Sequence, residues 1–333
     1  MLFNVCALYI KIMNNENQTI HKSDDNLTIY GWNEKLNQLK QESIYSTLAH
    51  GRVSIVHRTC YEVISGNGLF QCELTGNMMY GKSDDELPCT GDWVIFQPFD
   101  EHKGIIVDRL PRERTLYRKK SGTVADKQAI ASYVDKAFIV QSLDDNFNVR
   151  RVERFMVQIM EENISSVLVL NKADLDFDRQ SVEEQIKHIS SQIPVFFTSI
   201  HQLETIVRLR KSISEGETVV FVGSSGVGKS SLVNALCEKP VLLTSDISLS
   251  TGKGRHTSTR REMVLMDSSG VLIDTPGVRE FGLAIDNPDS LAEVLEISDY
   301  AELCRFKDCK HINEPGCAVI EAVSYTHLRA HET

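Results

Sequence analysis

An eight-residue segment at positions 223–230, Gly-Ser-Ser-Gly-Val-Gly-Lys-Ser, constrains the fold of this chain most strongly. It fits the pattern G-x-x-x-x-G-K-[ST] in full, between an apolar run at residues 218–222 and a helical pattern at 231–237. In such a strand–loop–helix, backbone N–H groups and the helix N-terminus point at phosphate oxygens. The sequence therefore predicts a nucleotide-phosphate site, with Lys229 as a point charge and the Ser230 hydroxyl as a Mg²⁺ ligand. The expected contact residues are Gly223, Ser224, Ser225, Gly226, Val227, Gly228, Lys229, Ser230 and Ser231.

A second motif, Asn171-Lys-Ala-Asp174, follows an apolar run at residues 167–170 and fits N-K-x-D. The Asp174 carboxylate can accept hydrogen bonds from both N1–H and the N2 amino group of guanine. Adenine lacks these donors, and a site that leaves a buried polar group unpaired rejects an analogue strongly. Lys172 is expected to lie along the base, and Asn171 to tie this loop to the phosphate loop. The two motifs together predict a guanine nucleotide.

Three further stretches are typical of the same kind of site. An apolar run at residues 271–273 leads into a D-x-x-G in which Asp274 would hold the Mg²⁺ shell and the Gly277 amide would contact the γ-phosphate. The polar loop at residues 254–259 carries the hydroxyls of Thr257 and Thr259, which could reach Mg²⁺. Ser199, after a strand-like run at 194–197, stands where a GTPase places the loop that touches guanine O6.

The motifs occur in the order base loop (residues 171–174), second base loop (198–200), phosphate loop (223–230), switch I (254–259) and switch II (274–277). A standard GTPase begins with the phosphate loop instead. This order indicates a circular permutation, which a compact domain tolerates when its termini lie close together. In its motifs and their order, the chain resembles the ribosome small-subunit-dependent GTPase A family (RsgA, also called YjeQ or YloQ) over roughly residues 51–323. The family has a small residue where Ile200 stands here.

The resemblance implies a GTP hydrolase that binds the small (30S) ribosomal subunit and its rRNA, acts in late subunit maturation and is stimulated by the subunit. Ras-type enzymes orient the attacking water with a Gln after D-x-x-G. Val278 occupies that position here, so another group is needed, and His256 in the switch I loop is the candidate catalytic residue. The Mg²⁺ would accompany GTP.

A cysteine cluster near the C-terminus has the spacing C-x₄-C-x-H-x₅-C. Three thiolates and one imidazole are the ligand set of a closed tetrahedral zinc site, whose role is structural. Nothing in the sequence suggests secretion, so disulfides are not expected. We expect one zinc ion per chain, bound by Cys304, Cys309, His311 and Cys317.

The N-terminal part predicts a small β-barrel. Five short alternating runs, separated by turn signals, occupy residues 52–57, 60–64, 69–74, 92–97 and 104–108. Five strands suit an OB-type barrel, which binds oligonucleotides, while an SH3-like barrel has a similar strand count. The resemblance favours the OB fold, since residues 91–94 (Gly-Asp-Trp-Val) match a stretch of the family's OB domain.

The expected fold class is multidomain, with an OB-type barrel, a circularly permuted P-loop α/β GTPase domain and a small zinc domain. Strand runs alternating with helical patterns at residues 150–161 and 181–191 predict a parallel sheet covered on both faces. The expected boundaries are an N-terminal extension at 1–50, the OB domain at 51–116, the GTPase domain at 117–285, the zinc domain at 286–323 and a non-native tail at 324–333. The family's further C-terminal helix has no counterpart here, and Met13 is an alternative start.

Charge and hydropathy limit the classes of partner that this chain is expected to bind. The net charge of −10 argues against indiscriminate nucleic-acid binding, and no apolar run approaches the length of a membrane span. We expect a cytoplasmic monomer. One segment is basic, with Glu113 as its single acid, and could grip phosphates; the alternative is a solvated linker. Its basic residues are Arg109, Arg112, Arg114, Arg118, Lys119 and Lys120.

Two other functions remain open from the residues alone. A P-loop ATPase or kinase-like enzyme would let ATP compete well for the site, against the prediction for Asp174. An RNA-binding protein with a vestigial nucleotide site would bind RNA unchanged by a Lys229→Ala substitution.

Overall fold

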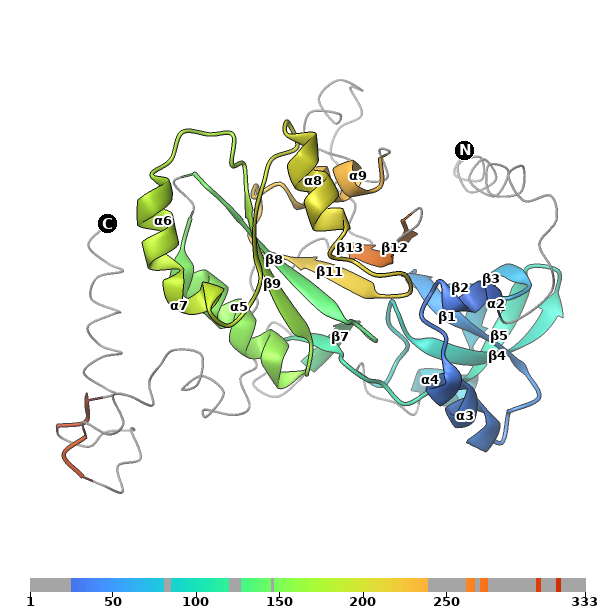
Figure 1. Ribbon diagram of the computed structural model, residues 1–333. Helices are drawn as coiled ribbons and strands as arrows, with labels where there is room; N and C mark the ends of the chain where they lie inside the picture. The colour runs from blue at the N-terminus through green and yellow to red at the C-terminus, as the bar shows by residue number, and fades with distance from the viewer. Residues whose placement is uncertain are drawn as a thin grey trace.

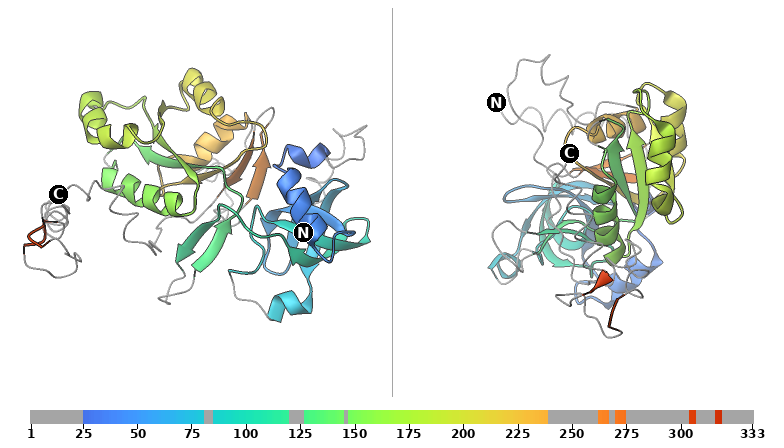
Figure 2. Two further views of the ribbon diagram at one scale, coloured as in Figure 1. Left: turned by 60° about the horizontal axis from the view of Figure 1, so that its bottom comes forward. Right: turned by 90° about the vertical axis from the view of Figure 1, so that its left-hand side faces the viewer.

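The computed structural model describes residues 25–80, 85–119, 127–144, 147–238, 262–266, 270–274, 304–306 and 316–318. A barrel (blue to cyan) and an α/β part (green to orange) lie side by side in Figure 1 and in the left view of Figure 2. Among the described residues, no helix is long and apolar enough to cross a membrane.

The predicted five-stranded barrel is confirmed. Each of its strands lies within three residues of a predicted run, and the order β1-β2-β3-β5-β4 closes through pairing of β1 with β4. The β3–β5 pair is parallel, and α4 follows β3. This closed order is that of an OB fold rather than its SH3-like rival. The elements are β1 (Ala49–Val56), β2 (Tyr61–Ser65), β3 (Gly68–Leu74), α4 (Gly76–Tyr80), β4 (Trp93–Asp100) and β5 (Lys103–Arg109).

Side chains from several strands fill the barrel. Buried residues from four strands, including Val53, Val63, Phe70 and Phe96, form one cluster. In β2 and β3, buried positions alternate with half-buried or exposed ones, the period of two expected for strands that are buried on one face and solvated on the other. In β1 and in the first half of β4, the buried residues are consecutive.

The α/β part is a mostly parallel sheet in the order β12-β13-β11-β8-β9-β10. Five strands are parallel, and β12 pairs antiparallel with β13 at the edge. Their apolar runs are nearly continuous because helices cover both faces. The strands are β8 (Lys136–Ser142), β9 (Ser165–Asn171), β10 (Val195–Thr198), β11 (Thr218–Val222), β12 (Glu262–Leu265) and β13 (Val271–Asp274).

Alternate residues of these strands serve two cores. Ile139, Leu168 and Val220 face the layer of α5 (Val149–Glu161), α6 (Arg179–Gln185) and α7 (Lys187–Ser190). Phe138, Val169 and Phe221 face the layer of α8 (Leu203–Arg210) and α9 (Lys229–Leu236). The predicted helix at 150–161 is confirmed. The pattern at 181–191 forms two short helices instead of one, with the break at Ile186.

Helix α5 shows how the sequence sets an element. The Asn148 side chain accepts a 3.0 Å hydrogen bond from the Arg151 amide and so caps the helix. Buried residues at the spacing of one helix face follow, namely Val152, Phe155, Met156 and Ile159.

The described residues before the barrel also pack on it. Helix α2 (Asp25–Thr28), helix α3 (Glu34–Glu42) and the segment between them bring Leu27, Leu36 and Trp32 against Trp93 and Tyr133. Part of the expected N-terminal extension therefore contributes to a core. The barrel is joined to the α/β sheet by pairing of β1 with β12 and by a hairpin of β6 (Leu116–Lys119) and β7 (Lys127–Ala131).

A buried polar joint holds the barrel to the α/β part. The Arg112 guanidinium donates to both oxygens of Asp92, with a closest distance of 2.7 Å, and these side chains are 8% and 0% exposed. The Ser132 hydroxyl and the Cys89 amide donate to the same carboxylate at 2.6 and 2.7 Å. The carboxylate thus connects the turn before β4, the segment after β5 and the segment after β7.

Arg52 is the second centre of this joint. Its fully buried guanidinium donates to the carbonyls of Tyr30 and Gly91 and, at 2.9 Å, to the hydroxyl of Thr218 at the start of β11. Burial lowers the pKa of Arg52 to about 10, which still leaves it charged at neutral pH. The group links the segment after α2, the barrel and the strand that ends at the phosphate loop.

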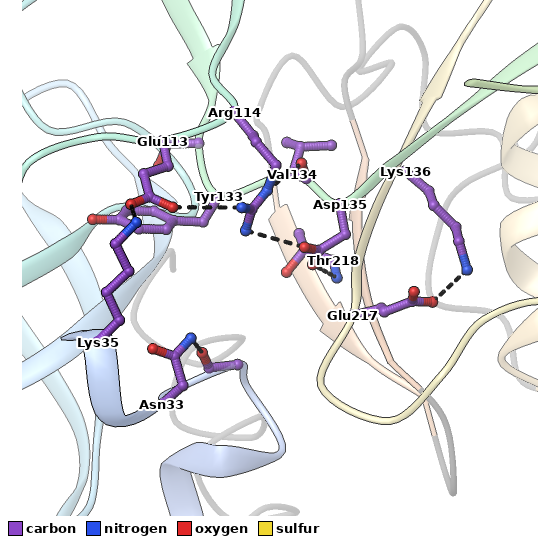
Figure 3. Close-up of polar contacts among 12 residues, drawn as sticks. Asn33, Lys35, Glu113, Arg114, Tyr133, Val134, Asp135, Lys136, Glu217 and Thr218 are labelled. Carbon is purple, nitrogen blue, oxygen red and sulfur yellow. Dashed lines mark hydrogen bonds and ion pairs between the residues drawn. The ribbon is translucent and has the colours of Figure 1, made fainter. Parts of the chain in front are cut away.

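Figure 3 shows a row of contacts along the joint. Lys35 of α3 pairs with Glu113, Glu113 with Arg114, and Arg114 with Asp135 at 3.1 Å. Asp135 then accepts from the Thr218 amide at 2.8 Å.

These contacts correct the interpretation of the basic segment. Arg112 and Arg114 are bound to Asp92 and Asp135, and Arg118 donates to Gln128 at 2.7 and 2.9 Å. These three arginines are therefore paired within the protein, which neither interpretation of the segment predicted. The sequence shows no local partner for Arg112 or Arg114, because their acidic partners lie about twenty residues away in the chain. The side chains of Lys119 and Lys120 lie outside the described residues.

Candidate nucleotide site

The predicted site loops follow the carboxyl ends of neighbouring parallel strands. The phosphate loop follows β11, the N-K-x-D loop follows β9, the second base loop follows β10 and the D-x-x-G begins at the end of β13. Because these strands are parallel, their carboxyl ends meet at one edge of the sheet. In open α/β sheets, this edge is where ligands bind.

The phosphate loop has the backbone that its glycines permit. Gly223 and Gly228 have φ values of +148° and +94°. A Cβ on Gly228 would lie 2.3 Å from the Asn171 Nδ2 atom, and one on Gly223 would lie 2.3 Å from the Val140 carbonyl oxygen. Only glycine fits at either position, since both the backbone angle and the space exclude a side chain.

Helix α9 begins at Lys229, directly after this loop. The Lys229 ammonium donates to the carbonyls of Gly223 and Ser224 at 2.7 Å each, so it folds back over the loop. Ser230 and Ser231 occupy the first turn of the helix. The arrangement brings an ammonium, a helix N-terminus and hydroxyls together, which suits it to bind a polyphosphate.

Asn171 joins the base loop to the phosphate loop, as the sequence predicts. Its buried side chain donates from Nδ2 to the Val227 carbonyl at 2.9 Å. The Thr198 hydroxyl, at the end of β10, donates to Asn171 Oδ1 at 3.3 Å. One amide thus ties together the ends of three strands that are far apart in the chain.

Asp174 is exposed beside Ser199. A hydrogen bond from the Ser199 hydroxyl is the main cause that holds the pKa of Asp174 below its usual value. The carboxylate is therefore ionised at neutral pH and acts only as an acceptor, as guanine recognition requires.

Ser199 itself is buried, and its backbone amide donates to the Thr205 hydroxyl at 3.0 Å. The Ser199 hydroxyl also accepts from the His201 amide at 3.1 Å. These contacts make it a support for Asp174 and leave its amide already bound.

Lys172 extends toward the end of β8. Its ammonium donates to the Asp144 carboxylate at 2.8 Å. No motif in the sequence marks Asp144 or Thr205 as part of the site. The signal for Asp144 is an apolar strand run at residues 137–140 followed by polar residues, the same pattern that precedes Asn171.

His256, Thr257, Thr259 and Gly277 lie outside the described residues, as does the side chain of Asp274. Cys309 and His311 of the predicted zinc site also lie outside them.

Of the predicted zinc ligands, Cys304 and Cys317 are described, with their sulfur atoms 3.8 Å apart. No group of three or more potential metal ligands occurs within the described part of the chain, where only these two of the four are present.

Comparison with known proteins identifies the family. A family model described as RsgA GTPase matches residues 109–284, more than half of the chain. The small ribosomal subunit biogenesis GTPase RsgA 1 of Bacteroides thetaiotaomicron is 74% identical over 311 residues, covering 93% of this chain and 86% of that protein. The chain belongs to the RsgA GTPase family. It is accordingly a GTPase, as the motifs predict.

More distant RsgA-family relatives agree. The small ribosomal subunit biogenesis GTPase RsgA of Methanosarcina acetivorans is 38% identical over 322 residues, covering 93% of this chain and 85% of that protein. The crystal structure of YjeQ from Thermotoga maritima has a TM-score of 0.60 at 26% identity, covering 84% of this chain and 92% of that one.

The structure of YloQ, described as a circularly permuted GTPase, has a TM-score of 0.56 at 22% identity, covering 86% of this chain and 91% of that one. This likeness concerns the fold. It agrees with the predicted permutation, since the phosphate-loop strand β11 comes after β8, β9 and β10 in this chain.

Proposed function

We propose that this RsgA-family GTPase binds the small (30S) ribosomal subunit and its rRNA, and that GTP hydrolysis acts as a timer in late subunit maturation. The observation that carries the proposal is the 74% identity, over 93% of the chain, to a protein named for small-subunit biogenesis. The OB-type barrel supports it, because such barrels bind oligonucleotides. The protein would work as a monomer in the cytoplasm.

The roles assigned to the site residues belong to this proposal. Residues 223–231 would bind the phosphates of GTP, while Asn171, Lys172 and Asp174 would hold the guanine base with support from Ser199. The Thr257 and Thr259 hydroxyls and the Gly277 amide would complete the site around the γ-phosphate. An adenine nucleotide is disfavoured because the Asp174 carboxylate is only an acceptor.

The residues present fit a Mg²⁺ ion. Ser230 lies in the first turn of α9, and β13 runs parallel to β11, so that Asp274 ends at the same sheet edge as the phosphate loop. Hydroxyl and carboxylate oxygens are the ligands that Mg²⁺ prefers. When bound, the ion would offset charge on the phosphate oxygens.

The proposed division of the chain is an extension at 1–50, an OB domain at 51–116, a GTPase domain at 117–285 and a zinc domain at 286–323. The boundary between residues 50 and 51 does not separate two packed units, because β1 begins at Ala49 and α3 packs on the barrel.

Hydrolysis should be slow alone and fast on the small subunit. The position after D-x-x-G is Val278, which cannot orient water. We assign that task to His256, which would act once a partner orders its loop. A His256→Ala variant should bind GDP normally and lose at least about tenfold of the subunit-stimulated rate. The measurement is GTP turnover with and without purified small subunits.

This assay tests the ribosomal function and the catalytic role of His256 independently. If small subunits leave wild-type turnover unchanged, the ribosomal function is wrong. Full stimulation of His256→Ala, with normal stimulation of the wild type, rejects only the catalytic role of His256.

Zinc is proposed to hold the C-terminal domain together through Cys304, Cys309, His311 and Cys317. The two described sulfurs support this, because tetrahedral zinc with Zn–S bonds of about 2.3 Å places two sulfurs about 3.8 Å apart. The observed separation is 3.8 Å, far longer than a disulfide bond.

Since zinc binding at such sites is coupled to folding, a Cys317→Ser variant should lose the metal and unfold this domain first. Metal analysis should find one zinc per wild-type chain and well under half of that in Cys317→Ser. Cys60→Ser is the matched control, because Cys60 lies between β1 and β2 of the barrel, where its thiol accepts a hydrogen bond from Gln71. A folded wild type without zinc would contradict the site.

A further inference from the structure

The carboxylate of Asp144 is held in a fixed position beside the base loop. It lies two residues beyond the end of β8, and each of its oxygens accepts a hydrogen bond from a described residue. Ser142 donates its hydroxyl to Oδ1 at 2.7 Å, and Lys172 donates its ammonium to Oδ2 at 2.8 Å. The carboxylate is therefore oriented by its own strand and bound to the neighbouring loop.

The backbone brings the two side chains together. Ser142 and Asn171 are partners at the ends of β8 and β9, and the Leu143 amide continues this pairing with a 2.9 Å hydrogen bond to the Asn171 carbonyl. Lys172 comes next and has a φ of +62°, in the left-handed region that non-glycine residues seldom adopt. The chain turns there, and the lysine stem runs from the end of β9 to the end of β8.

The polar members of the N-K-x-D motif are thus each held by a residue at or beyond the end of a neighbouring strand. Asn171 is bound to the Val227 carbonyl in the loop after β11, and Asp174 accepts from Ser199 after β10. The partner of Lys172 is Asp144 after β8.

We propose that Asp144 is a positioning residue for guanine-nucleotide binding, which acts by anchoring the Lys172 ammonium so that the lysine stem covers the plane of the base. The proposal rests on the proposed role of the base loop. A lysine side chain loses much rotamer freedom when it is fixed, and the ion pair fixes it before the base arrives. The effect is moderate, since the two side chains are 35% and 23% exposed.

An Asp144→Ala variant should raise the Kd for GDP about three- to fivefold, the range expected for a partly exposed ion pair. IDP lacks the N2 amino group but keeps the base plane, so its Kd should rise by the same factor. Fluorescence competition against a labelled guanine nucleotide measures both constants. Asp144→Glu should recover part of the affinity. Asp100→Ala is the control, because it removes an exposed, paired carboxylate of the barrel.

A double-mutant cycle tests whether Asp144 acts through Lys172. Lys172→Met removes the ammonium and keeps an apolar stem, so adding Asp144→Ala to it should cost no further GDP affinity. Additive losses, or a Kd ratio of IDP to GDP that shifts in Asp144→Ala, would show a general effect on the loop and overturn the proposal.

The same measurements distinguish a wrong role for the base loop from a wrong role for Asp144. If the wild type does not bind GDP, that assignment falls and the role of Asp144 falls with it. Equal GDP affinities of the wild type and Asp144→Ala reject the role of Asp144 alone.

Discussion

Replacing Asp92 by Ala should destabilise this protein by about 3–5 kcal/mol, the usual cost of removing one partner from a buried ion pair. The change leaves the Arg112 guanidinium, which is 8% exposed, without the carboxylate to which it donates. It also removes the acceptor for Ser132 and the Cys89 amide. The melting midpoint should fall by roughly 10 °C.

Tryptophan fluorescence reports directly on this joint. The chain has two tryptophans, Trp32 and Trp93, and both are buried there with ring centroids 4.8 Å apart. Asp100→Ala is the matched control, because the Asp100–Lys103 pair in the same barrel spans 3.8 Å and both side chains are 57% exposed. Its effect should stay below about 1 kcal/mol. If Asp92→Ala melts like Asp100→Ala, the joint does not hold the two parts together.

An Asp174→Asn substitution should weaken GDP binding at least about tenfold and favour XDP relative to GDP. The amide keeps the shape of the side chain but replaces one acceptor by a donor. It then opposes the N2 amino group of guanine and suits the carbonyl that xanthine carries there. Equilibrium titration with GDP and XDP measures the change. Because Asp174 is exposed, the Asp174→Asn variant should have the melting temperature of the wild type. Equal melting temperatures would show that the loss of affinity is a binding defect and not unfolding.

The strands and helices that could be predicted from the sequence are those with a recognisable pattern within a few consecutive residues. The barrel strands were predicted within three residues, since β2, β3 and the start of β5 alternate between buried and more exposed positions and turn residues separate the strands. The β11–loop–α9 unit was predicted because its glycines are required at fixed positions. The β6–β7 hairpin was not, because its strands are short and carry no clear alternation.

The polar joint was missed for a physical reason. Whether Arg112 is a surface charge or a buried partner depends on Asp92, twenty residues earlier, and no periodicity links the two. Within the site, the contact of Asn171 with the phosphate loop was predictable from the motif pair. The contact of Lys172 with Asp144 was not, since it depends on β8 lying beside β9 in the sheet.

We propose that the loops after β9 and β11 form one guanine-nucleotide site. Titration of the purified wild-type protein with GDP and, in parallel, with ADP tests this most directly. We expect saturable GDP binding and an ADP affinity lower by about two powers of ten or more, since adenine offers the Asp174 carboxylate no pair of donors. Equal affinities for GDP and ADP would contradict a guanine-specific site.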